Sequence, residues 1–340
     1  MRGRLACLRR REATLATGGN MKLGLAFDPG QYAYWQERIT STLCDLVPDL
    51  VTVDCSTREA FDRHAPEVIV GHESEALIAC LQGPPTRLKW VQIMSAGLDR
   101  TLGVIGNAPV PFRITNVRGI HAEAMAEYLL AVLLYFEKRL GFFGECKAQK
   151  RWSRSSLGQL AGKRLLVCGA GGIGRRVGEV LAAVGVEAEA IARTPGPRAP
   201  FNRIHGLATL PGIVGEFDYV FCALPLTTAT RGVFSREVIQ AMRPGAIFVN
   251  IARGEMVDDQ ALIDALASGQ LAGAALDAFR DEPLPPDSPL WDVPNLLITP
   301  HVSGRFGAGH ELGLAVLRDN MSAYLSGAPL ITEVFPERGY

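Results

Sequence analysis

The chain has 340 residues, in which 35 lysines and arginines balance 35 aspartates and glutamates. A nucleic-acid-binding protein or a membrane-surface protein usually carries a basic surplus, so this balance argues against both classes. The sequence contains no run of about 18 consecutive apolar residues, so it predicts no transmembrane helix. Hydrophobic residues make up 48% of the sequence, and together with the length this predicts two globular domains.

Seven cysteines are scattered along the chain without a C-x-x-C pair, which argues against a disulfide framework and against a zinc site. Cys168 and Cys222 lie in apolar runs typical of buried strands, where cysteine acts as a small hydrophobic residue. No cluster of His, Cys, Asp or Glu has the spacing of metal ligands, so we expect no metal. We therefore expect reduced cysteines and a cytoplasmic location.

Residues 1–20 differ in composition from the rest of the chain. Glu12 is the one acid among five arginines, at Arg2, Arg4, Arg9, Arg10 and Arg11. An arginine-rich, acid-poor leader can be a transit peptide, whereas an extension of the start site would make Met21 the true start. We favour the extension, expect residues 1–20 to be disordered, and leave them out of the fold prediction.

From Met21 onward, short apolar runs alternate with segments of helical spacing, which predicts βαβ units and a parallel sheet. The first series of expected strands lies at residues 23–27, 50–53, 68–71, 90–94 and 110–116. Residues 121–143 then predict one long helix that is apolar on most faces, which is typical of a helix at a domain or subunit interface. This helix favours a homodimer.

A second series of expected strands lies at residues 164–168, 187–191, 219–222, 247–251, 273–276 and 296–299. Six strands joined mostly by helices are typical of a doubly wound, nucleotide-binding sheet. Residues 310–325 predict a final helix. We place the domain boundaries near residues 115 and 310.

A glycine-rich turn follows the first strand of this second series. The run GAGGIG at 169–174 places G-x-G-x-x-G between an apolar strand and a helical pattern. Gly169 would make the tight turn, Gly171 would let the backbone approach a pyrophosphate, and Gly174 would let helix and strand pack closely. The pyrophosphate would rest on N–H groups at the helix N-terminus. The turn therefore predicts a dinucleotide site at Gly169, Gly171, Gly172, Ile173 and Gly174.

The end of the next strand bears on which dinucleotide binds. Ala192 stands about 20 residues past the glycines, where an NAD-specific enzyme usually carries an acid for the ribose 2′-hydroxyl. Arg193 and Thr194 follow, and a guanidinium beside a hydroxyl suits a 2′-phosphate, so NADP(H) is favoured over NAD(H). Glu187 and Glu189 lie too early in the strand to reach the ribose. The alternative is that Arg193 is a solvated surface residue.

Three polar residues follow strand ends further along the chain, namely Arg253, Glu282 and His301. In an open α/β sheet the ligand crevice lies beyond the carboxyl ends of the strands, so all three can converge there. Each could also be an ordinary turn or loop residue, because Arg253 precedes a glycine, Glu282 precedes a proline and His301 follows a proline. Their occurrence together favours a catalytic group.

The motifs that hold these residues resemble the D-isomer-specific 2-hydroxyacid dehydrogenase family. The matching stretches are ALPLTTAT at 223–230, NIARGEMVDD at 250–259, LDAFRDEPL at 276–284, ITPHVS at 298–303, SAGLD at 95–99 and the glycine-rich turn. The resemblance runs from about residue 85 to the end, and Ala278 stands where the family usually has valine.

The resemblance implies an α/β fold of two doubly wound parallel-sheet domains. A Rossmann-type cofactor domain, residues 116–310, would be inserted in a flavodoxin-like substrate domain formed by residues 21–115 and 311–340. The small-molecule substrate would be a 2-oxo or 2-hydroxy acid.

The resemblance also implies roles for the polar residues. His301 would be the general acid, Glu282 would pair with it and orient the ring, and Arg253 would bind the substrate carboxylate and polarise the carbonyl. The N–H groups of Ala96 and Gly97, beside Ser95, would hold the other edge of the carboxylate. Asp277 would accept a hydrogen bond from the nicotinamide carboxamide. Cofactor contacts are further implied at Pro225, Thr230, Ile251, Ala252 and Ser303.

The implied function is NAD(P)H-dependent reduction of a small 2-oxo acid, such as glyoxylate or hydroxypyruvate, with His301 as the proton donor. Two alternatives remain: an NAD-dependent dehydrogenase of a larger D-2-hydroxy acid, and a dinucleotide-sensing regulatory protein on the same fold. Turnover of any 2-oxo acid separates the enzymes from the regulator. His72 and His121 are weaker candidates for the cleft, and no motif surrounds His64, His205 or His310.

Overall fold

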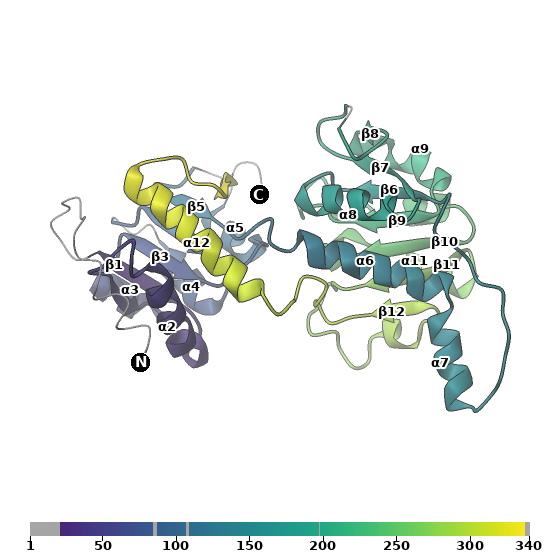
Figure 1. Cartoon of the computed structure of the whole chain (residues 1–340), viewed down its shortest axis with the longest axis horizontal. Helices are drawn as coiled ribbons and strands as arrows, with labels where there is room; N and C mark the ends of the chain where they lie inside the picture. Colours follow the sequence, from purple (N-terminus) through teal and green to yellow (C-terminus); the bar gives the residue numbers. More distant parts are fainter. Residues whose placement is uncertain (1–20, 84–86, 107–108, 197, 337–340) are drawn as a thin grey trace. The chain divides into compact units, whose positions relative to one another are not determined.

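The structure is a computed structural model that describes residues 21–83, 87–106, 109–196 and 198–336, so the expected leader at 1–20 lies outside the described residues. Two compact units divide the chain. The first unit runs to Ile120 and resumes at Gly307, whereas the second spans His121–Phe306. The sequence placed these divisions after residues 115 and 310. Each unit holds one β-sheet (Figure 1).

The sheet of the first unit has the strand order β13-β5-β4-β3-β1-β2. Its strands are β1 (Lys22–Ala26), β2 (Val51–Asp54), β3 (Val68–Gly71), β4 (Trp90–Ile93), β5 (Arg113–Thr115) and β13 (Glu333–Val334). Neighbouring strands pair in parallel, except that β13 is antiparallel to β5. The sequence did not predict β13, because two residues are too short to show alternation.

Helices cover both faces of this sheet, because alternate residues of each buried strand point to opposite faces. Leu23 and Leu25 pack in one core with α2 (Tyr32–Leu43) and α12 (Gly309–Ser326). Ala26 and Ile69 pack in the other core, which α3, α4 and α5 cover. These three helices span Arg58–His64, Glu75–Leu81 and Asp99–Ile105, and a short 3-10 helix, η1, spans Pro29–Gln31.

The sheet of the second unit is parallel throughout, with the order β12-β11-β10-β9-β6-β7-β8. Its strands are β6 (Arg164–Cys168), β7 (Glu187–Ile191), β8 (Ile204–His205), β9 (Tyr219–Cys222), β10 (Ala246–Asn250), β11 (Leu271–Leu276) and β12 (Leu296–Ile298). The strand order reverses between β6 and β9, which is where such a sheet binds its ligand. β8 is an addition to the six expected strands and is again only two residues long.

Two layers of helices enclose the second sheet. One face packs against α6 (Ala122–Glu137) and α8 (Gly172–Ala182). The other packs against α9 (Leu210–Ile213), α10 (Arg236–Ala241) and α11 (Asp259–Ala267). Short 3-10 helices η2 to η5 span Leu207–Thr209, Val214–Glu216, Gly254–Met256 and Pro289–Asp292. The fold is therefore α/β in both units.

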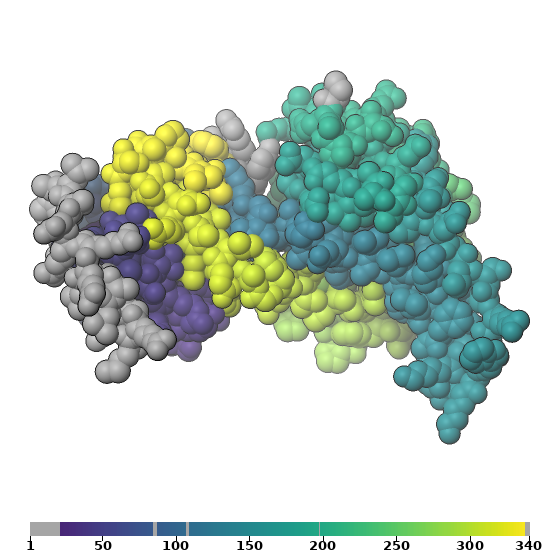
Figure 2. All heavy atoms as spheres, in the orientation of Figure 1, coloured from purple at the N-terminus to yellow at the C-terminus, as the bar shows by residue number. Residues whose placement is uncertain are grey.

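The expected helix at 121–143 is wrong as a single element. It ends at Glu137, and α7 (Leu140–Ala148) begins after Arg139, whose φ of 51° is left-handed and interrupts the helix. The apolar pattern continues across this break, so periodicity alone does not reveal it. α7 and the residues after it extend away from the second sheet (Figures 1 and 2), and Trp152 there is 92% exposed.

Among the described helices, none combines the length and apolar character needed to cross a membrane. Within the same residues, no group of three or more His, Cys, Asp and Glu side chains could hold a metal ion. Five of the six described cysteines are buried, and burial raises the pKa of the Cys222 thiol to about 12. These five cysteines are packed in the interior of the units.

Candidate active site

The glycine-rich turn lies between β6 and α8, where the strand order reverses. Gly169 has a φ of 119°, and a Cβ there would lie 2.6 Å from the carbonyl oxygen of Ala223. A Cβ on Gly174 would overlap the carbonyl oxygen of Gly169 and the side chain of Val167. Gly174 is therefore required for α8 to approach β6 this closely, and Gly169 for the turn to pack against the chain after β9.

Gly171 and Gly172 border open space, since a Cβ on either would meet no atom within 4 Å. Gly171 is the N-cap residue of α8, and Ile173 packs partly against the core behind the turn. The first N–H groups of a helix have no partner inside the helix and carry partial positive charge. The turn thus has both the space and the donors that a pyrophosphate requires.

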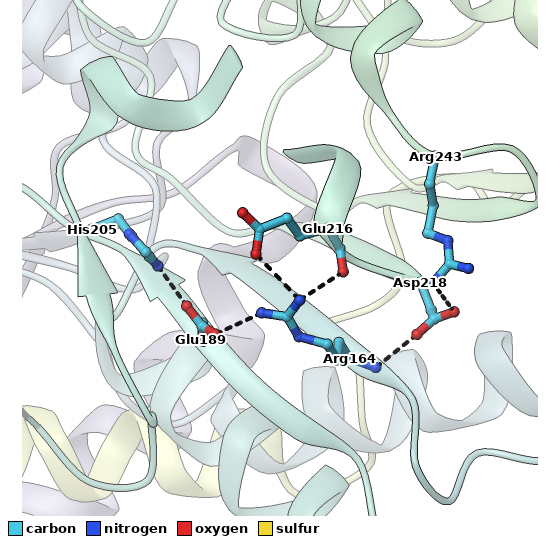
Figure 3. Close-up of polar contacts among 6 residues, drawn as sticks. All are labelled: Arg164, Glu189, His205, Glu216, Asp218 and Arg243. Atoms are coloured by element: carbon cyan, nitrogen blue, oxygen red, sulfur yellow. Dashed lines mark hydrogen bonds and ion pairs between the residues drawn. The ribbon is translucent and has the colours of Figure 1, made fainter. Parts of the chain in front are cut away.

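The residues after β7 carry no acid for a ribose. Ala192 follows the strand, and Arg193 and Thr194 are exposed beyond it. The nearest carboxylate in the strand belongs to Glu189, whose Oε1 accepts a hydrogen bond from Arg164 at 2.9 Å (Figure 3). Arg193 and Thr194 are therefore the first polar side chains after β7.

His205 also engages Glu189, with Nε2 lying 2.6 Å from Oε2. Burial alone would raise the pKa of Glu189, but His205 and Arg164 together hold that pKa below its usual value. The same network includes Glu216 and Asp218, which bond to Arg164 at the amino end of β6 (Figure 3). The network joins β6, β7 and β8, and it runs from His205, which is level with Ile191, to Arg164 at the amino end of β6.

The loop after β9 is closed by its own hydroxyl group. Thr230 Oγ1 donates to the carbonyl oxygen of Pro225 at 2.6 Å and accepts from the N–H of Thr227 at 2.8 Å. Thr230 is buried, whereas Pro225 is exposed. Thr230 therefore shapes the loop that presents Pro225 beside the glycine turn.

Arg253 follows β10 in a loop that Asn250 holds. The buried side chain of Asn250 accepts from the N–H of Ala252 and donates to the carbonyl oxygen of Arg253, each at 3.0 Å. A Cβ on Gly254 would overlap the backbone of Phe279, so the Arg253 loop packs directly on the chain after β11. Ile251 and Ala252 are buried under this loop. Asn250 and Gly254 were not singled out from the sequence.

Asp277 follows β11 and anchors the next loop. It is fully buried, and its carboxylate accepts from the N–H groups of Val302 and Ser303, each at 2.9 Å, and from Thr299 Oγ1 at 2.6 Å. Its own carbonyl oxygen accepts from the N–H of His301 at 2.9 Å. Asp277 therefore fixes the whole segment around His301, a positioning role that the motif alone does not reveal.

His301 and Glu282 form a pair at the carboxyl edge of the sheet. His301 Nδ1 lies 2.9 Å from Glu282 Oε2, and Glu282 Oε1 accepts from the N–H of Phe279 at 2.9 Å. Both side chains remain partly exposed. Because Nδ1 faces the carboxylate, Nε2 is the ring nitrogen left to face a ligand. Arg253, Glu282 and His301 thus follow the adjacent strands β10, β11 and β12.

A buried hydroxyl beside His301 has no partner in the part of the chain that the structure describes. Ser303 is only 5% exposed, yet its Oγ makes no hydrogen bond. Such a group normally has a partner, so a ligand atom would satisfy it. Together with the open space at Gly171, this orphaned hydroxyl fits a dinucleotide lying along the carboxyl edge from the glycine turn to His301.

Two residues of the N-terminal part of the second unit support the His301 loop. Tyr128 of α6 bonds through its hydroxyl to Thr299 Oγ1 at 2.7 Å, and burial raises the pKa of Tyr128 to about 12. His121 Nδ1 lies 2.9 Å from the carbonyl oxygen of Gly304, and burial lowers the pKa of His121. His121 therefore supports the loop through a backbone contact. No sequence motif marks Tyr128, which lies in an ordinary apolar helix.

The Ser95–Gly97 loop belongs to the first unit, where it follows β4. The carbonyl oxygen of Ala96 accepts from Asn116 Nδ2 at 2.8 Å, and Ser95 Oγ donates to the carbonyl oxygen of Gly97 at 3.3 Å. Across the described residues, neither the N–H of Ala96 nor that of Gly97 donates a hydrogen bond. The loop therefore offers two adjacent backbone donors.

Comparison with known proteins agrees with this geometry. The model of the D-isomer specific 2-hydroxyacid dehydrogenase NAD-binding domain matches residues 130–303. Glyoxylate/hydroxypyruvate reductase A of Salmonella choleraesuis is 29% identical over 80% of this chain and 90% of its own length. Hydroxyphenylpyruvate reductase of Plectranthus scutellarioides is 28% identical over 81% of this chain and 87% of its own length.

A solved structure is similar over nearly the whole chain. The D-isomer specific 2-hydroxyacid dehydrogenase from Xanthobacter autotrophicus Py2, in complex with NADPH and MES, has a TM-score of 0.80 at 27% identity. The match covers 95% of this chain and 100% of that structure. The chain therefore belongs to the D-isomer specific 2-hydroxyacid dehydrogenase family and is an NAD(P)-dependent oxidoreductase.

Proposed function

We propose that this protein reduces a small 2-oxo acid, glyoxylate or hydroxypyruvate, to its 2-hydroxy acid with NADPH. The pairing of His301 with Glu282 carries the proposal, because it leaves one imidazole nitrogen at the carboxyl end of the sheet, where Arg253 also follows its strand. Similarity to glyoxylate/hydroxypyruvate reductase A supports the choice of substrate.

The roles of the side chains follow from their chemistry. The bound reduced dinucleotide supplies a hydride to the carbonyl carbon of the oxo acid. His301 donates a proton from Nε2 to the carbonyl oxygen, and Glu282 holds the ring in the orientation that this transfer requires. Arg253 binds the substrate carboxylate with its planar guanidinium and polarises the carbonyl. The N–H groups of Ala96 and Gly97 are the proposed carboxylate donors of the first unit.

NADPH is the proposed reductant because the acid that selects NADH is missing after β7. Arg193 and Thr194 stand in its place, and Glu189 is engaged by Arg164 and His205. A guanidinium beside a hydroxyl binds a phosphate dianion well. The similar structure from Xanthobacter autotrophicus Py2 binds NADPH.

A larger oxo acid is the second candidate, since hydroxyphenylpyruvate reductase of Plectranthus scutellarioides is nearly as similar. The two candidates differ in the size of the group beside the carbonyl. A regulatory protein on the same fold is the third, and it would turn over none of these acids.

The chain is also proposed to act as a homodimer. The segment formed by α7 and the residues after it exposes Leu140, Trp152 and Leu157, at 52%, 92% and 51%. Large apolar side chains exposed on an extended segment are typical of a subunit interface. The mass in dilute solution tests this, and a value of 36.7 kDa would contradict it.

The experiment that tests the function follows oxidation of NADPH and NADH, separately, in the presence of glyoxylate, hydroxypyruvate or pyruvate, and of hydroxyphenylpyruvate as a larger acid. Rapid turnover of glyoxylate or hydroxypyruvate with NADPH, and slow turnover with NADH, is the expected result. Faster turnover of hydroxyphenylpyruvate than of the three small acids would favour the larger substrate. Cofactor binding without any turnover would favour the regulator.

A further inference from the structure

The loops after β3 and β4 of the first unit leave the sheet side by side. The two strands pair in parallel with Gly71 opposite Ile93, and neighbouring strands lie about 4.8 Å apart. Glu73 Oε1 accepts from the N–H of Thr101 at 2.8 Å, which ties the β3 loop to the helix that follows the Ser95–Gly97 loop. His72, the first residue after β3, therefore leaves the sheet beside Met94, two residues before Ala96 on the neighbouring strand.

Aromatic rings fix the orientation of His72. Its ring lies 5.3 Å from the ring of Phe27 and 5.0 Å from that of Trp35, with interplanar angles of 75° and 66°. A Cβ on Gly71 would overlap the carbonyl oxygen of Ala26, so the end of β3 is pressed against β1. The imidazole is thus held by packing on rigid elements.

The nitrogens of this ring have no hydrogen-bond partner among residues 21–83, 87–106, 109–196 and 198–336. They are also not among the buried side-chain atoms that lack a partner, so they reach the surface of the unit. The ring is therefore fixed by packing, and its nitrogens are available to a ligand.

Burial, together with the repulsion of His310, lowers the pKa of His72 to about 4 against the attraction of Asp28. The ring is therefore neutral near pH 7 and offers one donor and one acceptor. A hydroxyl group both donates and accepts, so it matches a neutral imidazole. A second carboxylate or a phosphate would find no positive charge on this ring.

We propose that His72 is a specificity-determining residue whose imidazole binds the hydroxyl group on the carbon next to the carbonyl of hydroxypyruvate. The proposal rests on the proposed function, because it takes the substrate carboxylate to bind the N–H groups of Ala96 and Gly97. A three-carbon acid held there extends its substituent toward the neighbouring loop. The site therefore selects oxo acids with an uncharged, hydrogen-bonding substituent.

The test uses the full chain with NADPH and three acids that differ only in this substituent: glyoxylate with hydrogen, pyruvate with a methyl group and hydroxypyruvate with a hydroxymethyl group. His72→Phe keeps the ring contacts with Phe27 and Trp35 but removes both nitrogens. It should lower kcat/KM for hydroxypyruvate by about tenfold, through loss of one hydrogen bond, and leave glyoxylate nearly unchanged. His72→Gln should restore part of the loss.

His64→Phe is the matched control, since His64 ends α3 at the amino end of β3, and it should change none of the three values. Equal losses on glyoxylate and hydroxypyruvate in His72→Phe would show a packing role and overturn the proposal, as would no change on either acid. If the unmodified protein turns over none of the three acids, the proposed function fails first and the assignment of His72 falls with it. The fluorescence of Trp90, which is buried in the first unit, shows for each variant that this unit is folded.

Discussion

The backbone of His301 has a φ of 52°, a left-handed conformation that costs a residue with a side chain about 1–2 kcal/mol. The hydrogen bonds around it offset this cost, because the N–H groups of His301, Val302 and Ser303 all donate to Asp277. Strain held by a buried carboxylate is typical of a residue whose side chain must point in one direction.

Arg253 should contribute to binding of the oxo acid and not to binding of the dinucleotide. Arg253→Ala removes a charge-assisted pair with the substrate carboxylate, so KM for glyoxylate should rise about 10- to 100-fold while NADPH affinity stays the same. Steady-state kinetics and a binding titration measure the two effects. Arg236→Ala, which removes an exposed guanidinium paired with Asp264, is the control. Equal losses of both affinities would indicate a structural role for Arg253.

Arg193 should distinguish the two dinucleotides. Arg193→Ala removes the proposed partner of the 2′-phosphate and should weaken NADPH binding about tenfold without affecting NADH. Titration of both reduced dinucleotides, by their fluorescence, measures the ratio, with Arg236→Ala again as the control. An unchanged preference would place the 2′-phosphate elsewhere.

At the scale of elements, the loop after β12 depends on a single buried group. Asp277→Asn replaces one carboxylate oxygen by an NH₂ group. This NH₂ group would face one of the donors from which Asp277 now accepts a hydrogen bond. Leaving such a buried donor unpaired costs about 1–3 kcal/mol, so urea unfolding should shift to lower concentration and turnover should fall with it. Asp287→Asn, an exposed change of the same kind, should alter neither. Wild-type turnover in Asp277→Asn would show that Asp277 is not needed to position the segment around His301.

The elements that the sequence predicts best are those with an uninterrupted apolar run. The strands expected at 68–71, 164–168, 187–191 and 219–222 have the bounds of β3, β6, β7 and β9. Two-residue strands such as β8 and β13 carry no periodic signal, and the left-handed turn at Arg139 leaves the apolar pattern unbroken. Elements are thus predictable where burial dominates and missed where tertiary pairing or one dihedral angle decides.

The residues of the site divide in the same way, into those that sequence motifs identify and those that only the tertiary fold brings together. The motifs identify the glycine turn and the residues Arg253, Glu282 and His301, because these types stand at strand ends in a fixed order. They do not identify the contact between Tyr128 and Thr299, since it joins α6 to β12 across the fold. The engagement of Glu189 by His205 depends on β8, which the sequence did not predict.

At the scale of the whole molecule, the two units carry separate sheets and cores, so they can unfold in separate steps. Tryptophan fluorescence distinguishes them, because Trp35 and Trp90 are buried in the first unit. Trp152 and Trp291 are exposed in the second. Unfolding of the first unit should therefore produce most of the change in tryptophan fluorescence.

The stability of the first unit should fall in acid because of His72. Its pKa is about 4 in the folded protein and 6.5 when unperturbed, so the stabilisation is complete above pH 6.5 and is lost as pH falls toward 4. The full loss is about 3 kcal/mol. The free energy of unfolding of the wild type should thus drop more between pH 7 and pH 4.5 than that of His72→Phe. Parallel pH profiles would contradict the burial of a neutral ring.

The role of His301 as proton donor is tested by comparing glyoxylate reduction by NADPH in the unmodified protein and in His301→Gln, with NADPH affinity measured for both. Loss of the proton donor should lower kcat about 10²- to 10⁴-fold while NADPH still binds. A variant that binds NADPH and keeps near-normal turnover would show that His301 is not the acid, and the proposed mechanism would be wrong.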